Sequence, residues 1–200
     1  MAGAAFAIRS SAATRRSPLH AEIEVLRARQ DLTEARHEIT EVLHRYARGW
    51  DREDEATIRD CFWPDSTHQH GAFRGLSHEF VAISFKATRN VKLMSHSISN
   101  ISIEIVGNRA VSECHFLAYH RRPSRTGSGE VDWFLKGRYL DRFERRSGVW
   151  KIAHRRGLHD FARTFEPADT SLASAPADQL SAPRPLDPLY AMLEELRTGR

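Results

Sequence analysis

The sequence is poor in cysteine, with only Cys61 and Cys114 among its 200 residues. The two are not spaced as a CxxC pair, so neither a zinc site nor a disulfide framework is predicted. Both are expected to be small buried side chains in a reducing compartment. The chain also lacks any apolar run approaching the roughly 18–20 residues that cross a membrane. We therefore expect a cytoplasmic protein without a membrane partner.

A contiguous basic stripe is missing as well, although the formal net charge is +4. Arginine doublets are scattered along the chain, at positions 15–16, 121–122, 145–146 and 155–156. Surfaces that bind nucleic acid usually gather their positive charge on one face or segment. No nucleic-acid partner is expected.

Composition divides the chain into three regions. Residues 1–30 are expected to form a flexible extension with at most a short helix. Its first seventeen residues are rich in Ala, Ser and Arg and lack acids, which resembles a transit peptide, but a disordered extension is the preferred interpretation. Residues 31–165 should form the folded domain, and 166–200 an Ala/Pro/Ser-rich tail that ends in a short helix over 187–197.

Helical periodicity marks three segments in the first half of the domain. Apolar residues recur at spacings of three, four and seven between positions 20 and 50. A capping-box pattern at 31–34 places the start of this helix near Leu32, and Gly49 is its expected C-cap. A short second helix is predicted over 53–62, a short strand over 65–73, and a third helix over 75–88.

Strand periodicity dominates the second half. Ile101, Ile103 and Ile105 alternate with other residues, and Gly107-Asn108 predicts a hairpin turn within the segment 91–122. Two more strands are expected over 131–142 and 149–160. Helices followed by sequential strands indicate an α+β fold, with three N-terminal helices packed on a strongly curved, mainly antiparallel sheet. The mouth of such a curved sheet is a natural apolar pocket.

Two polar residues lie at the ends of expected elements, where functional side chains are common. Asp51 follows the long helix, and His96 begins a strand. A buried Asp–His pair would fix the imidazole tautomer and make His96 a general base near neutral pH. In the alternative interpretation Asp51 only caps its helix, and a separation of more than about 4 Å would favour that alternative.

Other candidates have weaker support from the sequence. His68 and His70 lie two apart on a short strand, but no third ligand is evident, so no metal is expected. His115 is a candidate to face the pocket. Phe116 and Trp133 belong either to the core or to the pocket wall, and the sequence leaves both options open.

Three segments carry a resemblance to a known family: LTEARHEITEVLHRYARGWDRED, HSISNISIEI and GRYLDRFERRSGVWKIAHRR. The last is the most specific, with a strand, an Arg-Arg-x-Gly turn and then Trp-Lys-Ile. Residues 31–165 thus resemble the SnoaL-like branch of the nuclear transport factor 2-like superfamily. The resemblance implies a cone-shaped α+β barrel, and it bears on the fold more than on the function.

Lyases of this superfamily use a His–Asp dyad to remove a proton while a leaving group departs from the neighbouring carbon. Their aspartate and histidine match Asp51 and His96, and an asparagine four residues on matches Asn100. The resemblance also aligns Arg155 with an arginine that supplies charge for the leaving group. Tyr46 matches a dehydratase tyrosine that holds a substrate oxygen, where dehydrochlorinases carry a lysine. The resemblance implies no cofactor.

The resemblance implies a cofactor-independent lyase (a dehydratase-like elimination) or an isomerase, acting on a small hydrophobic ring compound such as a steroid, polyketide or aromatic catabolite. The alternative is a non-catalytic module for small-molecule binding or assembly, like the small subunits of ring-hydroxylating dioxygenases. An isomerase of the ketosteroid type would use a carboxylate base, and the position of His96 disfavours it. The superfamily also implies a homo-oligomer, a dimer or trimer.

Overall fold

The structure, a computed structural model, describes residues 17–125, 127–168, 175–176 and 179–199. The expected extension up to residue 16, with its transit-peptide-like composition, lies outside these residues, as does part of the expected tail. The chain divides into two compact units, Met1–Glu34 and Ala35–Arg200. Among the described helices, none is long and apolar enough to span a membrane.

Helix α1 (Pro18–Asp51) is 34 residues long. The expected start near Leu32 is wrong. Residues 18–31 are mostly Glu, Arg, Leu, Ala and Gln, which favour helix, and the only proline stands at the first position, where it is tolerated. The buried side chains of α1 all lie from Ala35 onward, at helical spacings. The second half of α1 therefore supplies the helix's contribution to the core.

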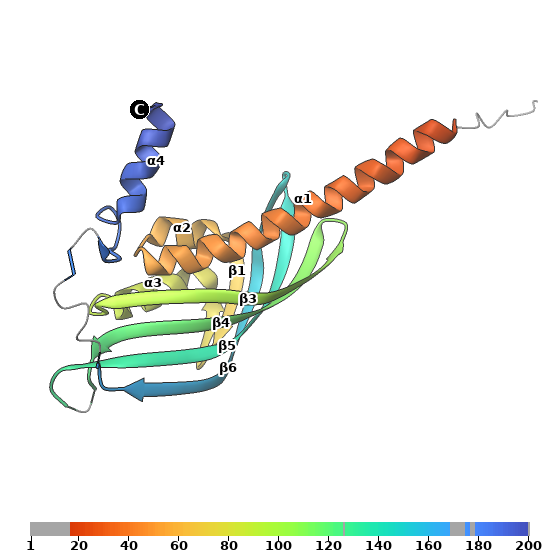
Figure 1. The fold of residues 1–200 in the computed structure, drawn as a ribbon. Coiled ribbons are helices and arrows are strands. Elements are labelled where there is room, and N and C mark those ends of the chain that lie inside the picture. The colour runs from red at the N-terminus through yellow and green to blue at the C-terminus, as the bar shows by residue number, and fades with distance from the viewer. Residues whose placement is uncertain (1–16, 126, 169–174, 177–178, 200) are drawn as a thin grey trace, which may run out of the picture. The chain divides into compact units, whose positions relative to one another are not determined.

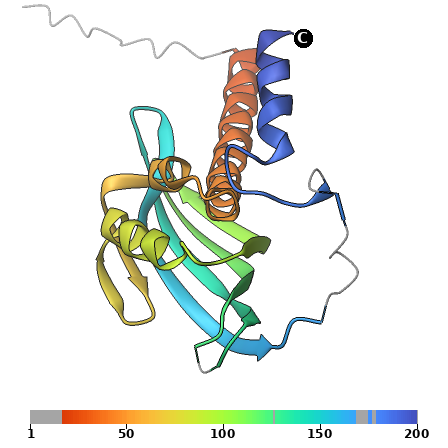
Figure 2. The same cartoon turned by 90° about the vertical axis from the view of Figure 1, so that its left-hand side faces the viewer.

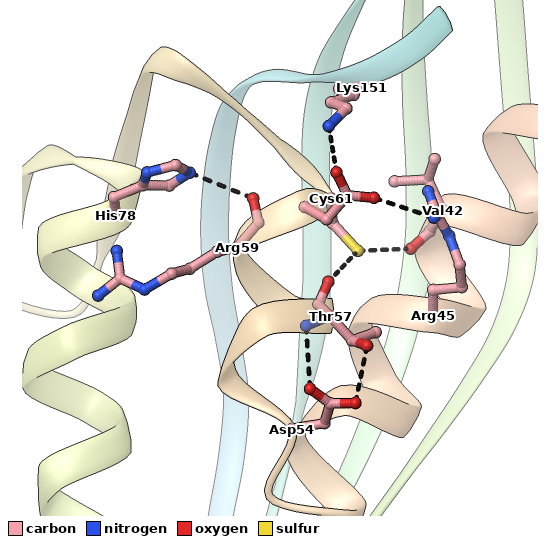
Figure 3. A network of polar contacts seen from close by, with 9 residues as sticks. Val42, Arg45, Asp54, Thr57, Arg59, Cys61, His78 and Lys151 are labelled. Carbon is pink, nitrogen blue, oxygen red and sulfur yellow. Dashed lines mark hydrogen bonds and ion pairs between the residues drawn. The ribbon is translucent and has the colours of Figure 1, made fainter.

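Helix α2 (Glu55–Asp60) follows a tight turn and packs back onto α1. Asp54 caps it by accepting hydrogen bonds from the Thr57 amide and hydroxyl, at 3.1 and 2.9 Å (Figure 3). The Cys61 thiol points at the Val42 carbonyl, 3.6 Å away (Figure 3). Gly49 is not the expected C-cap but lies inside α1, where a Cβ would come within 2.7 Å of the Ile58 side chain. Glycine here allows the two helices to approach closely.

Six strands form one strongly curved sheet (Figures 1 and 2). They are β1 (Phe62–His70), β2 (Phe73–Leu76), β3 (Leu93–Val106), β4 (Arg109–Pro123), β5 (Glu130–Arg146) and β6 (Val149–Phe165). Helix α3 (Ser77–Ala87) follows β2 and precedes β3 in the chain. The spatial order is β2-β1-β6-β5-β4-β3, so β2 and β3 are the open edges. All pairs are antiparallel except β1 with β6. The expected α+β fold is confirmed.

The predicted hairpin of β3 and β4 is confirmed, with its turn at Gly107-Asn108. Gly107 has φ +57°, a left-handed conformation that glycine adopts without strain. Alternate residues of β4 and β5 face the concave side of the sheet, where they join α1 in one apolar core. The concave side therefore holds both the core and any internal cavity.

The C-terminal part of the chain ends in α4 (Pro188–Thr198), close to the expected 187–197. Asp187 caps α4 through the Leu189 amide and also pairs with Arg52 at 3.2 Å. Arg184 donates to Asp54 at 2.7 Å. These contacts attach residues 184–187 to the turn that directly follows Asp51.

Candidate active site

Asp51 and His96 meet at the wall of a cavity. Asp51 is the last residue of α1, because the chain reverses at Glu53 (φ +50°) and the Asp54 amide bonds back to the Gly49 carbonyl at 2.8 Å. His96 lies near the start of edge strand β3. Its Nδ1 is 2.7 Å from Asp51 Oδ1, much less than the separation of about 4 Å above which Asp51 would be taken as a helix cap alone. The side chains are 10% and 17% exposed, so water screens this pair only partly.

This hydrogen bond determines which nitrogen of His96 is available for chemistry. With an ionised Asp51 as acceptor, Nδ1 of the neutral ring is the donor. Nε2 then carries a lone pair, and the His96 ring lines the cavity. A base so placed can take a proton from a bound molecule, and the carboxylate stabilises the imidazolium that forms.

The cavity has a volume of about 310 Å³ and lies between the concave face of the sheet and helices α1 and α3. Its lining is predominantly aromatic and aliphatic, and the polar groups are histidines, hydroxyls and Tyr46. Phe116 and Trp133, left open as core or pocket wall, both line it. The other lining residues are Trp50, His70, Phe80, Ser84, Thr88, Met94, Ala118, His120, Leu135, Tyr139 and His159.

Tyr46 lines the cavity from α1 and is only 2% exposed. Its ring packs edge-on against Trp50, Phe62 and Tyr139. Burial raises the pKa of the phenol above its ordinary value, although the positive charge of Arg155 opposes the shift. Tyr46 is therefore a protonated hydroxyl in the wall of the cavity, suited to donate a hydrogen bond to an oxygen atom.

Arg155 lies in the core and does not line the cavity. It is fully buried and forms a two-pronged ion pair with Asp141, at 2.8 and 2.6 Å. Its guanidinium lies 4.1 Å from the ring centres of both Tyr46 and Tyr139. The ion pair raises its pKa well above the ordinary value despite burial. This geometry does not favour the expected role of Arg155 at a leaving group. Arg155 instead packs behind the Tyr46 ring.

Asn100 and His115 also lie away from the cavity. Asn100 is exposed and has φ +52°, at an irregularity in β3 between Ser99 and Ser102. His115 pairs across the sheet with Arg138 and alternates with the cavity residue Phe116, so it occupies the opposite face. Substrate contact by these two residues is not supported by their positions.

Three further histidines line the cavity: His70, His120 and His159. His70 was a candidate only for a metal pair, and the sequence did not identify the other two as site residues. The rings of His96 and His120 are 5.4 Å apart. Burial, together with the charges of His96 and Arg122, lowers the pKa of His120 to about 3. The two-residue alternation of β4 places His120 on the face of Phe116 and Ala118, and this signal was available. His70 and His159 are brought together by the β1–β6 pairing, for which local sequence gave no signal.

The rings of His68 and His70 lie 5.9 Å apart, and both stack on Phe80. The His68 ring stacks on Phe80, with centroids 3.8 Å apart, while His70 Nε2 lies 2.8 Å from His159 Nε2. Within the described ranges, no group of three or more His, Cys, Asp or Glu side chains is arranged to hold a metal ion.

A profile of the SnoaL-like domain matches residues 31–156. No curated protein matches the sequence. Among solved structures, the chain is similar to a type 2 hexachlorocyclohexane dehydrochlorinase, with 17% identity, a TM-score of 0.62, and coverage of 70% of this chain and 94% of that one. A type 3 enzyme of this kind from Novosphingobium barchaimii shows 18% identity and a TM-score of 0.61, with coverage of 70% and 99%. A proposed scytalone dehydratase from Novosphingobium aromaticivorans shows 21% identity and a TM-score of 0.60, with coverage of 70% and 93%. At these identities the likeness establishes the fold.

Proposed function

Since this chain belongs to the SnoaL-like family, we propose that it is a cofactor-independent lyase that uses His96 as its general base. The observation that carries the proposal is the 2.7 Å contact between His96 Nδ1 and Asp51 Oδ1 at the wall of a largely apolar cavity. Two of the similar structures are named as dehydrochlorinases and one as a proposed dehydratase, and both reactions are eliminations.

The proposed reaction removes a proton and a leaving group from adjacent carbons. His96 Nε2 takes a proton from a carbon made acidic by a neighbouring carbonyl or double bond. The C–H electron pair forms the new double bond as the C–O bond to a hydroxyl group breaks. Tyr46 donates a hydrogen bond to the departing oxygen, and the proton held by His96 leaves with it as water. Asp51 stabilises the imidazolium between these steps.

Loss of an oxygen group is preferred over loss of halide because the buried Tyr46 phenol is a hydrogen-bond donor without a charge. A volume of about 310 Å³ is at the lower end of the usual range for ligand sites, which favours compact ring compounds. Trp50, Phe116 and Trp133 provide flat apolar surfaces for such rings. The proposed substrate is a small hydroxylated ring ketone or a related steroid, polyketide or aromatic catabolite.

The test is a screen of cyclic hydroxyketones for mass loss equal to one water, followed by variants of the dyad. His96→Gln should lower kcat by about 10²–10⁴-fold, because proton transfer from carbon loses its base. Asp51→Asn should cause a loss of similar order, since it removes the charge that stabilises the imidazolium. His115→Gln is the matched control: this histidine lies on the opposite face of β4, and full activity is expected.

Full activity in His96→Gln would refute the mechanism. Binding without turnover of every screened compound by the unaltered protein would favour the alternative, namely a non-catalytic module that binds small molecules or assembles with an enzyme. Folding of each variant is checked by thermal unfolding, so that a loss of activity is not confused with a loss of structure.

We also propose that the chain forms a homo-oligomer in the cytoplasm. The two cysteines are buried and free, which suits a reducing compartment. The outer face of the sheet carries Leu117, Phe161 and Phe165, exposed at 42%, 40% and 54%, and Leu117 and Phe161 both lie beside Lys136 of β5. Three exposed apolar side chains on one face of the sheet suit contact with a second copy. Light scattering during gel filtration should give a multiple of 22.8 kDa, and a monomer would contradict this proposal.

A further inference from the structure

Besides the Asp51–His96 dyad, the cavity contains a pair of histidines that the proposed elimination does not use. His70 on β1 and His159 on β6 both line the cavity, and their Nε2 atoms are 2.8 Å apart. A hydrogen bond at this distance needs one N–H and one lone pair, so a single proton lies between the two rings. The pair is therefore a polar group of fixed geometry in a largely apolar wall.

The surroundings of His70 determine the direction of this hydrogen bond. His70 Nδ1 is buried and has no hydrogen-bond partner among the described residues. On Nε2 the proton of neutral His70 has an acceptor in His159, whereas on Nδ1 it would have no partner, so Nε2 is the donor. His159 then carries its own proton on Nδ1. That side chain is exposed at the cavity edge, so this N–H is available to a ligand.

The fold makes room for this arrangement at Gly157. A Cβ there would lie 2.4 Å from His70 Nδ1, a distance that no real side chain could keep. On its other side the His70 ring stacks with Phe80, with centroids 5.3 Å apart and an interplanar angle of 24°. His70 is thus fixed between a glycine and an aromatic ring, and it holds His159 through Nε2.

The pair lies across the sheet from the proposed base. His96 is on β3 and His159 on β6, which are three neighbour positions apart in the strand order. The row of His96 crosses β5 at Leu135, two residues from Gly137, which is the partner of His159. Strands about 4.8 Å apart, with this offset, would separate the two backbones by roughly 16 Å in a flat sheet, and the curvature shortens this. One compact fused-ring molecule can therefore reach both groups.

We propose that His159, held by His70, donates a hydrogen bond to a carbonyl or hydroxyl oxygen of the ligand at the end of the cavity across from His96. This proposal deepens the proposed function and rests on it for the reaction. Binding of an oxygen substituent at His159 does not depend on the reaction. The favoured substrates are fused-ring compounds with two functional groups. One is the acidic carbon near His96, and the other is an oxygen substituent at the pair.

Binding of two probes by calorimetry tests the site without turnover: 1-indanone, which carries a ring carbonyl, and indane, its parent hydrocarbon. The unaltered protein should bind 1-indanone about three- to tenfold more tightly than indane, the effect of one hydrogen bond. His159→Phe should abolish this preference and leave indane binding within about twofold, which also shows that the cavity is intact. Gly157→Ala should reduce the preference as well, because it displaces His70 without removing either histidine.

His96→Gln separates this site from the proposed base, since the preference for 1-indanone should persist in that variant. A preference that survives His159→Phe, or one that disappears in His96→Gln, would overturn the assignment, as would equal binding of both probes to the unaltered protein. Loss of turnover in His96→Gln concerns only the elimination, so the two proposals fail separately.

Discussion

His68 allows a direct test of how burial in the core changes the pKa of a titratable group. It is 1% exposed on β1, with its ring stacked on Phe80, and neither ring nitrogen has a hydrogen-bond partner in the described part of the chain. Burial, and then the charge of Arg155, lowers the pKa of His68 from 6.5 to about 2. The folded protein therefore keeps this ring neutral under conditions in which the unfolded chain takes up a proton.

The direction of the pH effect follows from proton uptake. Below pH 6.5 the unfolded chain binds one more proton at His68 than the folded protein does, so acidification favours unfolding. Between pH 7.5 and 5.5 this lowers the free energy of unfolding by about 1.4 kcal/mol. His70 and His120, with pKa values lowered by burial to about 4 and 3, each add a similar amount. Together the three should cost about 4 kcal/mol, and almost nothing further should change between pH 7.5 and 8.5.

Replacing His68 with phenylalanine isolates one of these contributions. Phe has nearly the same shape, retains the stack on Phe80 and cannot bind a proton. The unfolding free energy of His68→Phe, measured by urea titration at both pH values, should fall by about 1.4 kcal/mol less than that of the parent protein. An identical pH dependence in parent and variant would mean that folded His68 takes up the proton, and the reasoning would be refuted.

Two further substitutions, one with a control variant, test the packing behind the cavity. Asp141→Asn should lower the unfolding free energy by about 3–5 kcal/mol in a urea titration, because it leaves the buried Arg155 cation without its carboxylate. Glu113→Gln is the control: its partner Arg138 is 38% exposed, and the substitution should cost less than about 1 kcal/mol in the same titration. Gly137→Ala should cost about 1–3 kcal/mol in thermal or urea unfolding, because its Cβ would lie 2.0 Å from a backbone carbonyl of β6, and an unchanged stability would show that the strands can separate there.

Local patterns in the sequence were sufficient for most of the fold. The alternation of Ile101, Ile103 and Ile105 and the Gly107 turn identified the β3–β4 hairpin, because both signals depend on neighbours in the chain. β2 was missed because Phe73–Leu76 is only four residues long and shows no clear alternation. The start of α1 was placed too late because a capping-box pattern carries no weight inside a continuous run of helix-forming residues.

The candidate site was predictable only in part. The positions of Asp51 and His96 at element ends, together with the family resemblance, were enough to suggest that they meet. The partners of Arg155 and His70 depend on the curvature of the sheet and on the parallel pairing of β1 with β6. These are contacts between residues far apart in the chain, and no local spacing encodes them.

The cavity histidines have different surroundings, and these determine which of them can act as a base. His70 and His120, with pKa values near 4 and 3, bind protons too weakly to remove one from carbon at neutral pH, but their neutral rings can donate or accept hydrogen bonds. Within the described residues, His96 is the one cavity histidine with a carboxylate partner. Only there would a newly formed imidazolium be matched by a negative charge inside a site largely shielded from water. The same apolar burial that holds the other two neutral thus strengthens the interaction between Asp51 and a protonated His96, and this contrast argues for His96 as the base.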